Sequence, residues 1–199
     1  MPIGAAKESV QVLIRGTTTD DEVYCQFLRT ELYRFRGPEQ TSIAALVNNP
    51  DFNDGSQNFD RRRLLFQVRY PLLAQLPNPL EWHSATMQTG DLEKLRLIRH
   101  CGWDDKALDN LVGKIRFPTA FDLTGQKKIA AILERIAASD FDKTLLLVAK
   151  VTDGPFTILD GNHRATAMMV AKLKGTFAEA DVNAYIGVSP RMGTCIWCA

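Results

Sequence analysis

Five consecutive residues near the C-terminal end of the chain have the side chains needed to bind and transfer phosphate: Asp160-Gly161-Asn162-His163-Arg164. They follow an apolar stretch and precede a run rich in alanine and methionine, so they are predicted to join a strand to a helix. The free N–H groups and positive dipole end at the start of a helix favour anions. Arg164 offers a planar fork of donors for phosphate oxygens, and His163 can donate to a phosphate or shuttle a proton. Asp160 can hold Mg²⁺ or accept a proton from a hydroxyl.

Each of these residues also has an ordinary structural interpretation. Asp160 can cap the helix, Gly161 can serve the turn, Arg164 can pair with a surface acid, and His163 can be simply exposed. Their concentration on one helical turn, directly after a buried hairpin, favours a site over four unrelated structural roles. The small residues Ala165 and Ala167 would let the helix pack closely behind that site.

The elements around this turn follow from the apolar pattern of the last third of the chain. The run TLLLVAKV is nearly continuous in apolar residues, which predicts a strand buried on both faces. The order helix, strand, turn, strand, helix, strand indicates an α+β fold. The predicted elements are a helix over 124–138, strands over 144–151 and 156–159 joined by a turn at 152–155, a helix over 161–174 and a strand over 181–188.

The N-terminal part is predicted to be mainly helical. Residues 9–14 alternate polar and apolar and can form a short edge strand, and the run Thr18-Thr19-Asp20-Asp21-Glu22 resembles a helix start. That helix ends at Gly37-Pro38. A short helix is expected over 41–48, a loop over the polar residues 49–62, and no clear element over 64–70.

Three prolines mark the clearest boundary in the sequence: Pro71, Pro77 and Pro79. They divide the chain into a mainly helical extension, residues 1–78, and a core, residues 79–199. In the core, a strand is expected over 80–87. Apolar residues at Leu92, Leu95 and Ile98 predict a helix that ends at Gly102, and a further helix is expected over 103–112.

The segment strand–turn–strand–DGNHRATA–helix resembles the ParB/sulfiredoxin superfamily, whose members carry a Gly-x-(His)-Arg turn followed by an alanine-rich helix. The resemblance covers about residues 79–190 and implies a small mixed sheet with packed helices. Sulfiredoxins use a cysteine where this chain has Asn162, so sulfinic-acid repair is not expected. Partition proteins bind CTP at a more arginine-rich turn and carry a helix-turn-helix, which this sequence does not show.

The Asp-Gly-x-His-Arg form most resembles free-serine kinases and ParB-like nucleases or ATPases. The resemblance implies that Gly161, Asn162, His163 and Arg164 hold the phosphates of ATP or ADP, with Thr166 on the next turn counted among them. It implies that Asp160 serves Mg²⁺ or the acceptor hydroxyl. A second acid is expected from earlier in the fold, and the sequence does not choose among the candidates Glu81, Asp91 and Glu93.

The overall composition limits the classes of function. Lys and Arg number 24 against 23 Asp and Glu, a net charge of +1, which argues against coating nucleic acid by charge alone. No apolar run approaches the ~20 residues of a membrane span, and the first residues do not resemble a secretory signal, so a cytoplasmic protein is expected. The basic cluster Asp60-Arg61-Arg62-Arg63 is either a solvated face or a phosphate-backbone contact.

The cysteine pair Cys195-Ile-Trp-Cys198 lies at the very end of the chain. It can be half of a zinc site with Cys25 and Cys101, or a redox pair, but neither has its usual context: Cys25 and Cys101 are far apart in sequence, and the pair does not open a helix. The favoured interpretation is that the two cysteines act as small apolar residues that pack the C-terminal segment against the rest of the protein.

Two main hypotheses of function follow from the sequence. The first is a nucleotide-dependent phosphotransferase or phosphohydrolase that acts on a small hydroxylated substrate, with Asp160, His163 and Arg164 as its catalytic residues. The second is a ParB-like DNA-binding or nuclease domain that uses the same turn for backbone phosphates. A non-catalytic nucleotide switch is the third possibility. The sequence does not indicate the oligomeric state.

Overall fold

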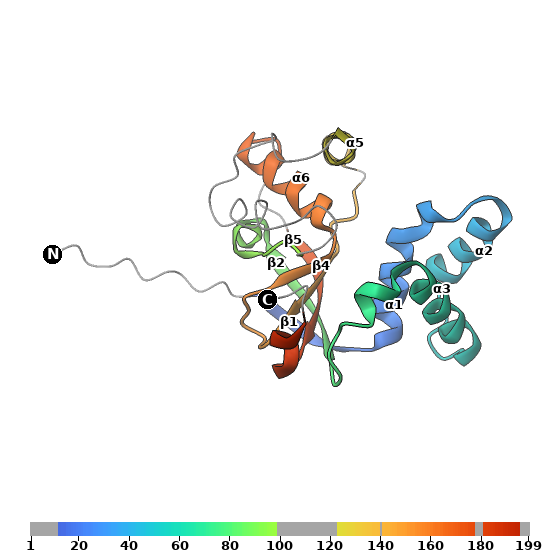
Figure 1. The fold of residues 1–199 in the computed structure, drawn as a ribbon. Coiled ribbons are helices and arrows are strands. Elements are labelled where there is room, and N and C mark those ends of the chain that lie inside the picture. The colour runs from blue at the N-terminus through green and yellow to red at the C-terminus, as the bar shows by residue number, and fades with distance from the viewer. Residues whose placement is uncertain (1–11, 99–122, 140, 178–180, 196–199) are drawn as a thin grey trace.

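The computed structural model describes residues 12–98, 123–139, 141–177 and 181–195. Within them the chain forms a mixed α+β structure around one five-stranded sheet of order β1-β2-β5-β3-β4, which confirms the expected class (Figure 1). The strands are β1 Leu13–Thr18, β2 Glu81–Gln88, β3 Leu145–Ala149, β4 Thr157–Asp160 and β5 Asp181–Val188. The helices are α1 Asp20–Glu31, α2 Gly37–Asn48, α3 Gly55–Leu73, α5 Leu123–Ala137 and α6 Asn162–Leu173, with short 3₁₀ helices η1 Leu32–Arg34, η2 Thr89–Lys94 and η3 Pro190–Thr194.

The sheet is mixed because one of its pairings is parallel. Strands β3 and β5 run parallel, whereas β1–β2, β2–β5 and β3–β4 are antiparallel pairs. Leu146 of β3 lies opposite Asp160 on one side and Tyr185 on the other. The hairpin β3–β4 therefore brings the end of β4 level with the start of β3, as the sequence predicts for a strand–turn–strand unit.

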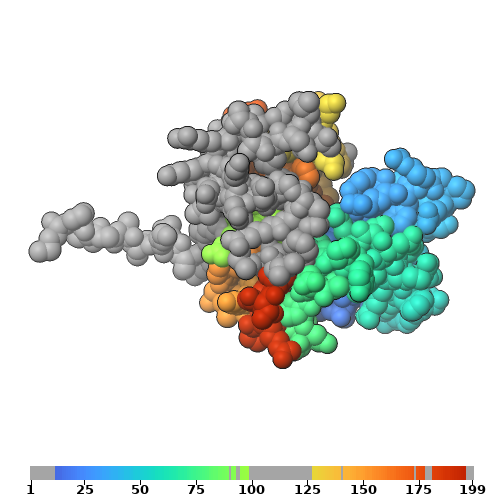
Figure 2. Space-filling view, in the orientation of Figure 1, coloured from blue at the N-terminus to red at the C-terminus, as the bar shows by residue number. Residues whose placement is uncertain are grey.

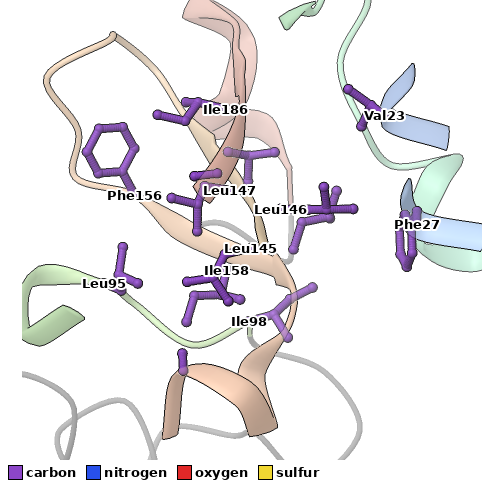
Figure 3. Packing of buried hydrophobic residues seen from close by; sticks show 14 of the residues in the cluster. Val23, Phe27, Leu95, Ile98, Leu145, Leu146, Leu147, Phe156, Ile158 and Ile186 are labelled. Carbon is purple, nitrogen blue, oxygen red and sulfur yellow. The ribbon is translucent and has the colours of Figure 1, made fainter. Parts of the chain in front are cut away.

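Strand β3 is buried on both faces, in agreement with its continuous apolar sequence. In Figure 3, Leu146 points toward Val23 and Phe27 of α1, whereas Leu147 and Ile158 lie toward Leu95 and Phe156. Helix α1 thus lies over one face of β3. On the other side, Leu95 and Phe156 pack near Leu147 and Ile158.

Helices α1, α2 and α3 pack on one another and form a lobe on one side of the sheet (Figures 1 and 2). Helix α1 begins where the sequence predicts, because the Thr19 hydroxyl accepts from the Glu22 N–H while the Glu22 carboxylate accepts from the Thr19 N–H. Strand β1 precedes this helix and pairs with β2, so residues 13–18 belong to the same sheet as residues 81–88.

The structure corrects three predictions in the N-terminal part. The edge strand is Leu13–Thr18, later than the predicted 9–14. Residues 49–62 were predicted to be a loop, but α3 begins at Gly55, because the Asp54 carboxylate accepts from the N–H groups of Ser56 (2.8 Å) and Gln57 (3.2 Å). The helix also continues past Pro71, which it accommodates through a non-helical Arg69 (φ −133°, ψ 15°).

The predicted helix through Leu92, Leu95 and Ile98 is also wrong. A 3₁₀ helix ends at Lys94, and the chain then runs extended beside β4. The Arg96 N–H donates to the Phe156 carbonyl and the Arg96 carbonyl accepts from the Ile158 N–H, both at 2.8 Å. Backbone pairing to the outer edge of β4 overrides the helical spacing of these residues. The helix predicted over 103–112 lies outside the described residues.

Candidate functional site

The predicted strand-to-helix turn is present, and it is abrupt. Strand β4 ends at Asp160, Gly161 adopts a left-handed conformation (φ 98°, ψ 17°), and α6 begins at Asn162. A Cβ atom on Gly161 would lie 2.6 Å from Cδ2 of Leu145. Glycine is therefore required both for the backbone conformation and for the close contact with β3.

The N-terminus of α6 lacks the acceptor that most helices place there. Gly161 is the N-cap residue and supplies no side-chain hydrogen bond, and the first turn of the helix contains no acidic residue. The first helical bond is made by the Ala165 N–H to the Gly161 carbonyl (2.8 Å). Neither the N-cap residue nor the first turn of α6 thus supplies an acceptor to the positive end of the helix dipole, which favours an anion at this position.

The Arg164 guanidinium lies between two carboxylates. Its Nη2 donates to Oδ2 of Asp160 at 2.8 Å, and its Nη1 lies 3.9 Å from Oδ2 of Asp142. The Arg164 and Asp160 side chains are each only 15% exposed. Nε of Arg164 is buried and has no hydrogen-bond partner among the described residues. No described residue therefore accepts the Nε–H of the guanidinium.

Helix α1, from the N-terminal part of the chain, also contributes side chains to the surroundings of Arg164. The Thr30 hydroxyl lies 3.0 Å from Oδ2 of Asp160 and 2.7 Å from the Phe27 carbonyl, so its one proton can serve only one of these acceptors at a time. The Gln26 amide donates to Oδ2 of Asp142 at 3.0 Å. Two polar side chains of the helical lobe thus contact the two carboxylates that flank Arg164.

Asp142 is the acid that the structure brings to this turn. Its partial burial raises the pKa of the carboxyl, but hydrogen bonds from the Thr144 N–H and hydroxyl, the charge of Arg164 and the Gln26 amide together outweigh that effect. The pKa of Asp142 is therefore held below its ordinary value. The carboxylate is ionised at neutral pH and adds to the negative charge around Arg164.

The sequence did not single out Asp142, although a signal for it was present. In an antiparallel hairpin the residues before the first strand lie beside those after the second. Asp142 precedes β3 and Asp160 ends β4, so the predicted hairpin already implied their proximity. Thr30 and Gln26 carried no such local signal, because only the packing of α1 on the sheet brings them to the turn.

The other predicted residues of the turn have buried or half-buried side chains. Oδ1 of Asn162 accepts from the Ile98 N–H at 3.2 Å, and its Nδ2 donates to the Ile158 carbonyl at 3.4 Å. The Thr166 hydroxyl is buried and donates to the Asn162 carbonyl at 2.8 Å. His163 is half-buried on the first turn of α6. The side chains of Asn162 and Thr166 therefore fix the backbone around the turn.

Of the candidates for a second acid, Glu81 is placed away from Asp160. Glu81 begins β2, three strands away from β4 in the sheet order, and lies 3.5 Å from His83. Asp91 lies in η2, where its carboxylate accepts from the Gln88 N–H at 3.1 Å. The side chain of Glu93 lies outside the described residues. Asp142, which was not among these candidates, is a carboxylate that the structure does place beside Arg164, at 3.9 Å.

The basic cluster on α3 is largely committed to contacts within the protein. Arg61 is fully buried and donates to the carbonyls of Leu46 and Asp51, both at 3.0 Å. Arg62 pairs with Asp21 at 2.8 Å, and Arg63 pairs with Asp60 at 3.5 Å. Arg61 is therefore unable to contact a phosphate backbone, while Arg62 and Arg63 remain about half exposed.

The cysteines give no support for a metal centre. Cys25 is buried, its Sγ lies 3.7 Å from the Val47 carbonyl, and burial raises the pKa of its thiol. Cys195 is also buried, whereas Cys101 and Cys198 lie outside the described residues. No group of three or more His, Cys, Asp or Glu side chains within the described ranges is arranged to hold a metal ion.

Comparisons of the chain with protein-family models, with curated proteins and with solved structures find no match. In the part of the chain that the structure describes, no helix is both long enough and apolar enough to cross a membrane.

Proposed function

We propose that this protein is a nucleotide-dependent phosphotransferase or phosphohydrolase that acts on a small hydroxylated substrate and holds the nucleotide phosphates at the Asp160–Arg164 turn. The observation that carries the proposal is that the buried Nε of Arg164 has no acceptor among the described residues and lies on the first turns of α6, whose N-cap Gly161 supplies no capping side chain. A phosphate would supply acceptors for both sets of donors. The resemblance of the DGNHRATA turn to the ParB/sulfiredoxin superfamily supports the same assignment.

Each residue of the turn would have its own role in phosphoryl transfer. The first N–H groups of α6 and the Arg164 guanidinium would bind the phosphate oxygens and neutralise their charge, which is most of what this reaction asks of a protein. His163 would add a donor on the same helical turn. Asp160 would accept the proton of the attacking hydroxyl or water.

Magnesium fits this site only together with the nucleotide. Oδ2 of Asp160 already accepts from Arg164 and Thr30, and none of the described residues donates to Oδ1. One free carboxylate oxygen is a typical protein contribution to Mg²⁺ that is otherwise held by phosphate and water. When bound, the metal would supply additional positive charge at the phosphates, with Asp160 as its protein ligand.

The test is calorimetric titration of the full chain with ATP, ADP and CTP in the presence of Mg²⁺. We expect one of these nucleotides to bind, His163→Ala to weaken the binding, and Arg164→Ala to abolish it. Arg164→Lys keeps the charge but loses the planar fork, so it should bind more weakly than the wild type. Arg36→Ala is the matched control, because Arg36 is an exposed arginine at the start of α2.

Each result bears on the proposal. Binding that survives Arg164→Ala would place the nucleotide elsewhere, and no binding by the wild type would overturn the enzyme hypothesis. Binding without turnover of any hydroxylated compound would favour a nucleotide switch. Retention of DNA that falls steeply with salt, in the absence of nucleotide binding, would favour the DNA-binding or nuclease alternative.

A further inference from the structure

We propose that Thr30 is a phosphoryl acceptor of this site, so that the protein phosphorylates its own helix α1. The inference rests on the proposed function and names a substrate for it within the chain. It starts from one contact: the Thr30 hydroxyl lies 3.0 Å from Oδ2 of Asp160, the residue assigned as proton acceptor. A general base must lie within about 2.6–3.2 Å of the proton that it removes, and this contact meets that condition.

The arginine proposed to bind the phosphate and the hydroxyl proposed to accept it contact the same atom, Oδ2 of Asp160. Arg164 donates to Oδ2 of Asp160, which is also the oxygen that Thr30 contacts. A phosphate bound by Arg164 and the start of α6 would therefore lie next to the Thr30 hydroxyl. Thr30 is half-buried, so the hydroxyl is partly shielded from competing water while it remains within reach of the turn.

Thr30 differs from Thr166, whose hydroxyl also lies near the turn, and from Thr144, whose hydroxyl bonds Asp142 and not Asp160. The Thr166 hydroxyl is buried and donates to the Asn162 carbonyl, which commits its proton to the backbone of α6. Among the described residues, Asp160 accepts a hydroxyl hydrogen bond from Thr30 alone. The alternative acceptor of the Thr30 proton is the Phe27 carbonyl, and rotation about one side-chain bond exchanges the two.

The transfer is balanced with a nucleoside triphosphate as the donor. Oγ1 of Thr30 attacks the γ-phosphorus, and the new Oγ1–P bond forms as the bond from that phosphorus to the oxygen bridging to the β-phosphate breaks. The hydroxyl proton passes to the Asp160 carboxylate, and a nucleoside diphosphate leaves. Arg164 stays beside the transferred phosphoryl group and balances part of its charge.

The product would change the contact between the helical lobe and the sheet. A phosphothreonine carries a charge of about −1.5 to −2 at neutral pH, and here it would face Asp160 and Asp142. It would compete with both carboxylates for Arg164. Phosphorylation is therefore expected to loosen the attachment of α1 to the end of β4.

The experiment incubates the full chain with ATP, and separately with CTP, in the presence of Mg²⁺ and follows the intact mass. We expect a gain of one phosphoryl group, mapped to Thr30 by fragmentation, at a rate per molecule that does not depend on protein concentration. Thr30→Val should gain nothing at this position, and Asp160→Asn should slow the transfer by about 10²-fold or more. Thr41→Val is the matched control, because Thr41 is a helical threonine whose hydroxyl donates to a backbone carbonyl on exposed α2.

A second measurement separates failure of this inference from failure of the proposed function. Thr30→Val should still bind nucleotide in the calorimeter, because its hydroxyl is not assigned to the phosphate-binding donors. Nucleotide binding by the wild type without phosphate on Thr30, or with phosphate on another residue, would overturn the inference and leave the proposed function standing. If the wild type binds no nucleotide, both are overturned.

Discussion

Thr30 and Asp160 are 130 residues apart in the chain, yet the Thr30 hydroxyl lies 3.0 Å from the Asp160 carboxylate. This contact and the one between Gln26 and Asp142 connect α1 to the two acids that flank Arg164. The orientation of Asp160 is therefore set by both parts of the chain. The helical lobe is a component of the candidate site as well as a cover for the sheet.

The shared carboxylate predicts that Thr30 and Asp160 contribute to stability together. Asp160→Ala should lower the free energy of unfolding by about 2–4 kcal/mol, because it removes the shorter of the two ion pairs of a mostly buried guanidinium. Thr30→Val should cost about 1 kcal/mol. The double variant should lose less than the sum, with a coupling energy of about 0.5–1.5 kcal/mol. Urea denaturation of the four proteins measures this, and strictly additive losses would show that the contact contributes nothing.

Replacing glycine by alanine should lower the stability of the protein by different amounts at Gly161 and at Gly175. Both have positive φ values, 98° and 68°, but a Cβ atom on Gly161 would overlap Leu145 whereas one on Gly175 meets nothing within 4 Å. Gly175→Ala should therefore cost only the backbone strain, about 1–2 kcal/mol. Gly161→Ala should cost about 3 kcal/mol or more, because overpacking adds to the strain. Thermal unfolding compares the two, and equal losses would contradict the close contact.

Asp142 predicts a dependence of stability on pH. Its pKa is lowered in the folded state, so the carboxylate stabilises the fold above the unfolded-state pKa of about 3.9 and this contribution is lost as the pH falls through the folded-state value. Asp142→Asn should be less stable than the wild type at pH 7, and the difference should shrink as the pH falls below about 4. Urea midpoints from pH 7 to pH 3 test this, with Asp153→Asn in the exposed turn after β3 as the control. A difference that stays constant with pH would be the contrary result.

Two arginines of the basic cluster, Arg61 and Arg63, should differ in how much they contribute to the free energy of unfolding. Arg61→Ala should lower the free energy of unfolding by about 3 kcal/mol or more, because it removes a fully buried side chain together with its hydrogen bonds to the carbonyls of Leu46 and Asp51. Arg63→Ala removes a surface ion pair and should cost less than about 1 kcal/mol. Similar melting temperatures for the two variants would mean that the buried network does not stabilise the lobe.

Local sequence was sufficient for the elements that carry the candidate turn. Continuous apolar residues predicted β3, and the change from an apolar run to Asp160-Gly161 predicted the junction of β4 and α6. The capping residues Thr19 and Glu22 predicted the start of α1. In each case the signal lies within a few residues of the feature, so a local pattern contains the necessary information.

Predictions failed where a local signal had two meanings or a distant contact decided the outcome. The polar run around Asp54 indicated a loop, although the same aspartate is an effective helix cap. The spacing of Leu92, Leu95 and Ile98 fits a helix, but backbone bonds from Arg96 to β4 keep the chain extended. Thr30 was missed for the second reason, since nothing near it in sequence indicates Asp160.

The backbone of Arg96 has a consequence for the behaviour of the protein in concentrated solution. Strand β4 ends the sheet, and an uncovered end strand is a template on which another chain can add and aggregation can begin. The two hydrogen bonds of Arg96 occupy that outer edge directly beside the strand that ends in Asp160. If this cover detached, copies of the protein would associate through β4, and the acid at its end would be the first part of the site to be displaced.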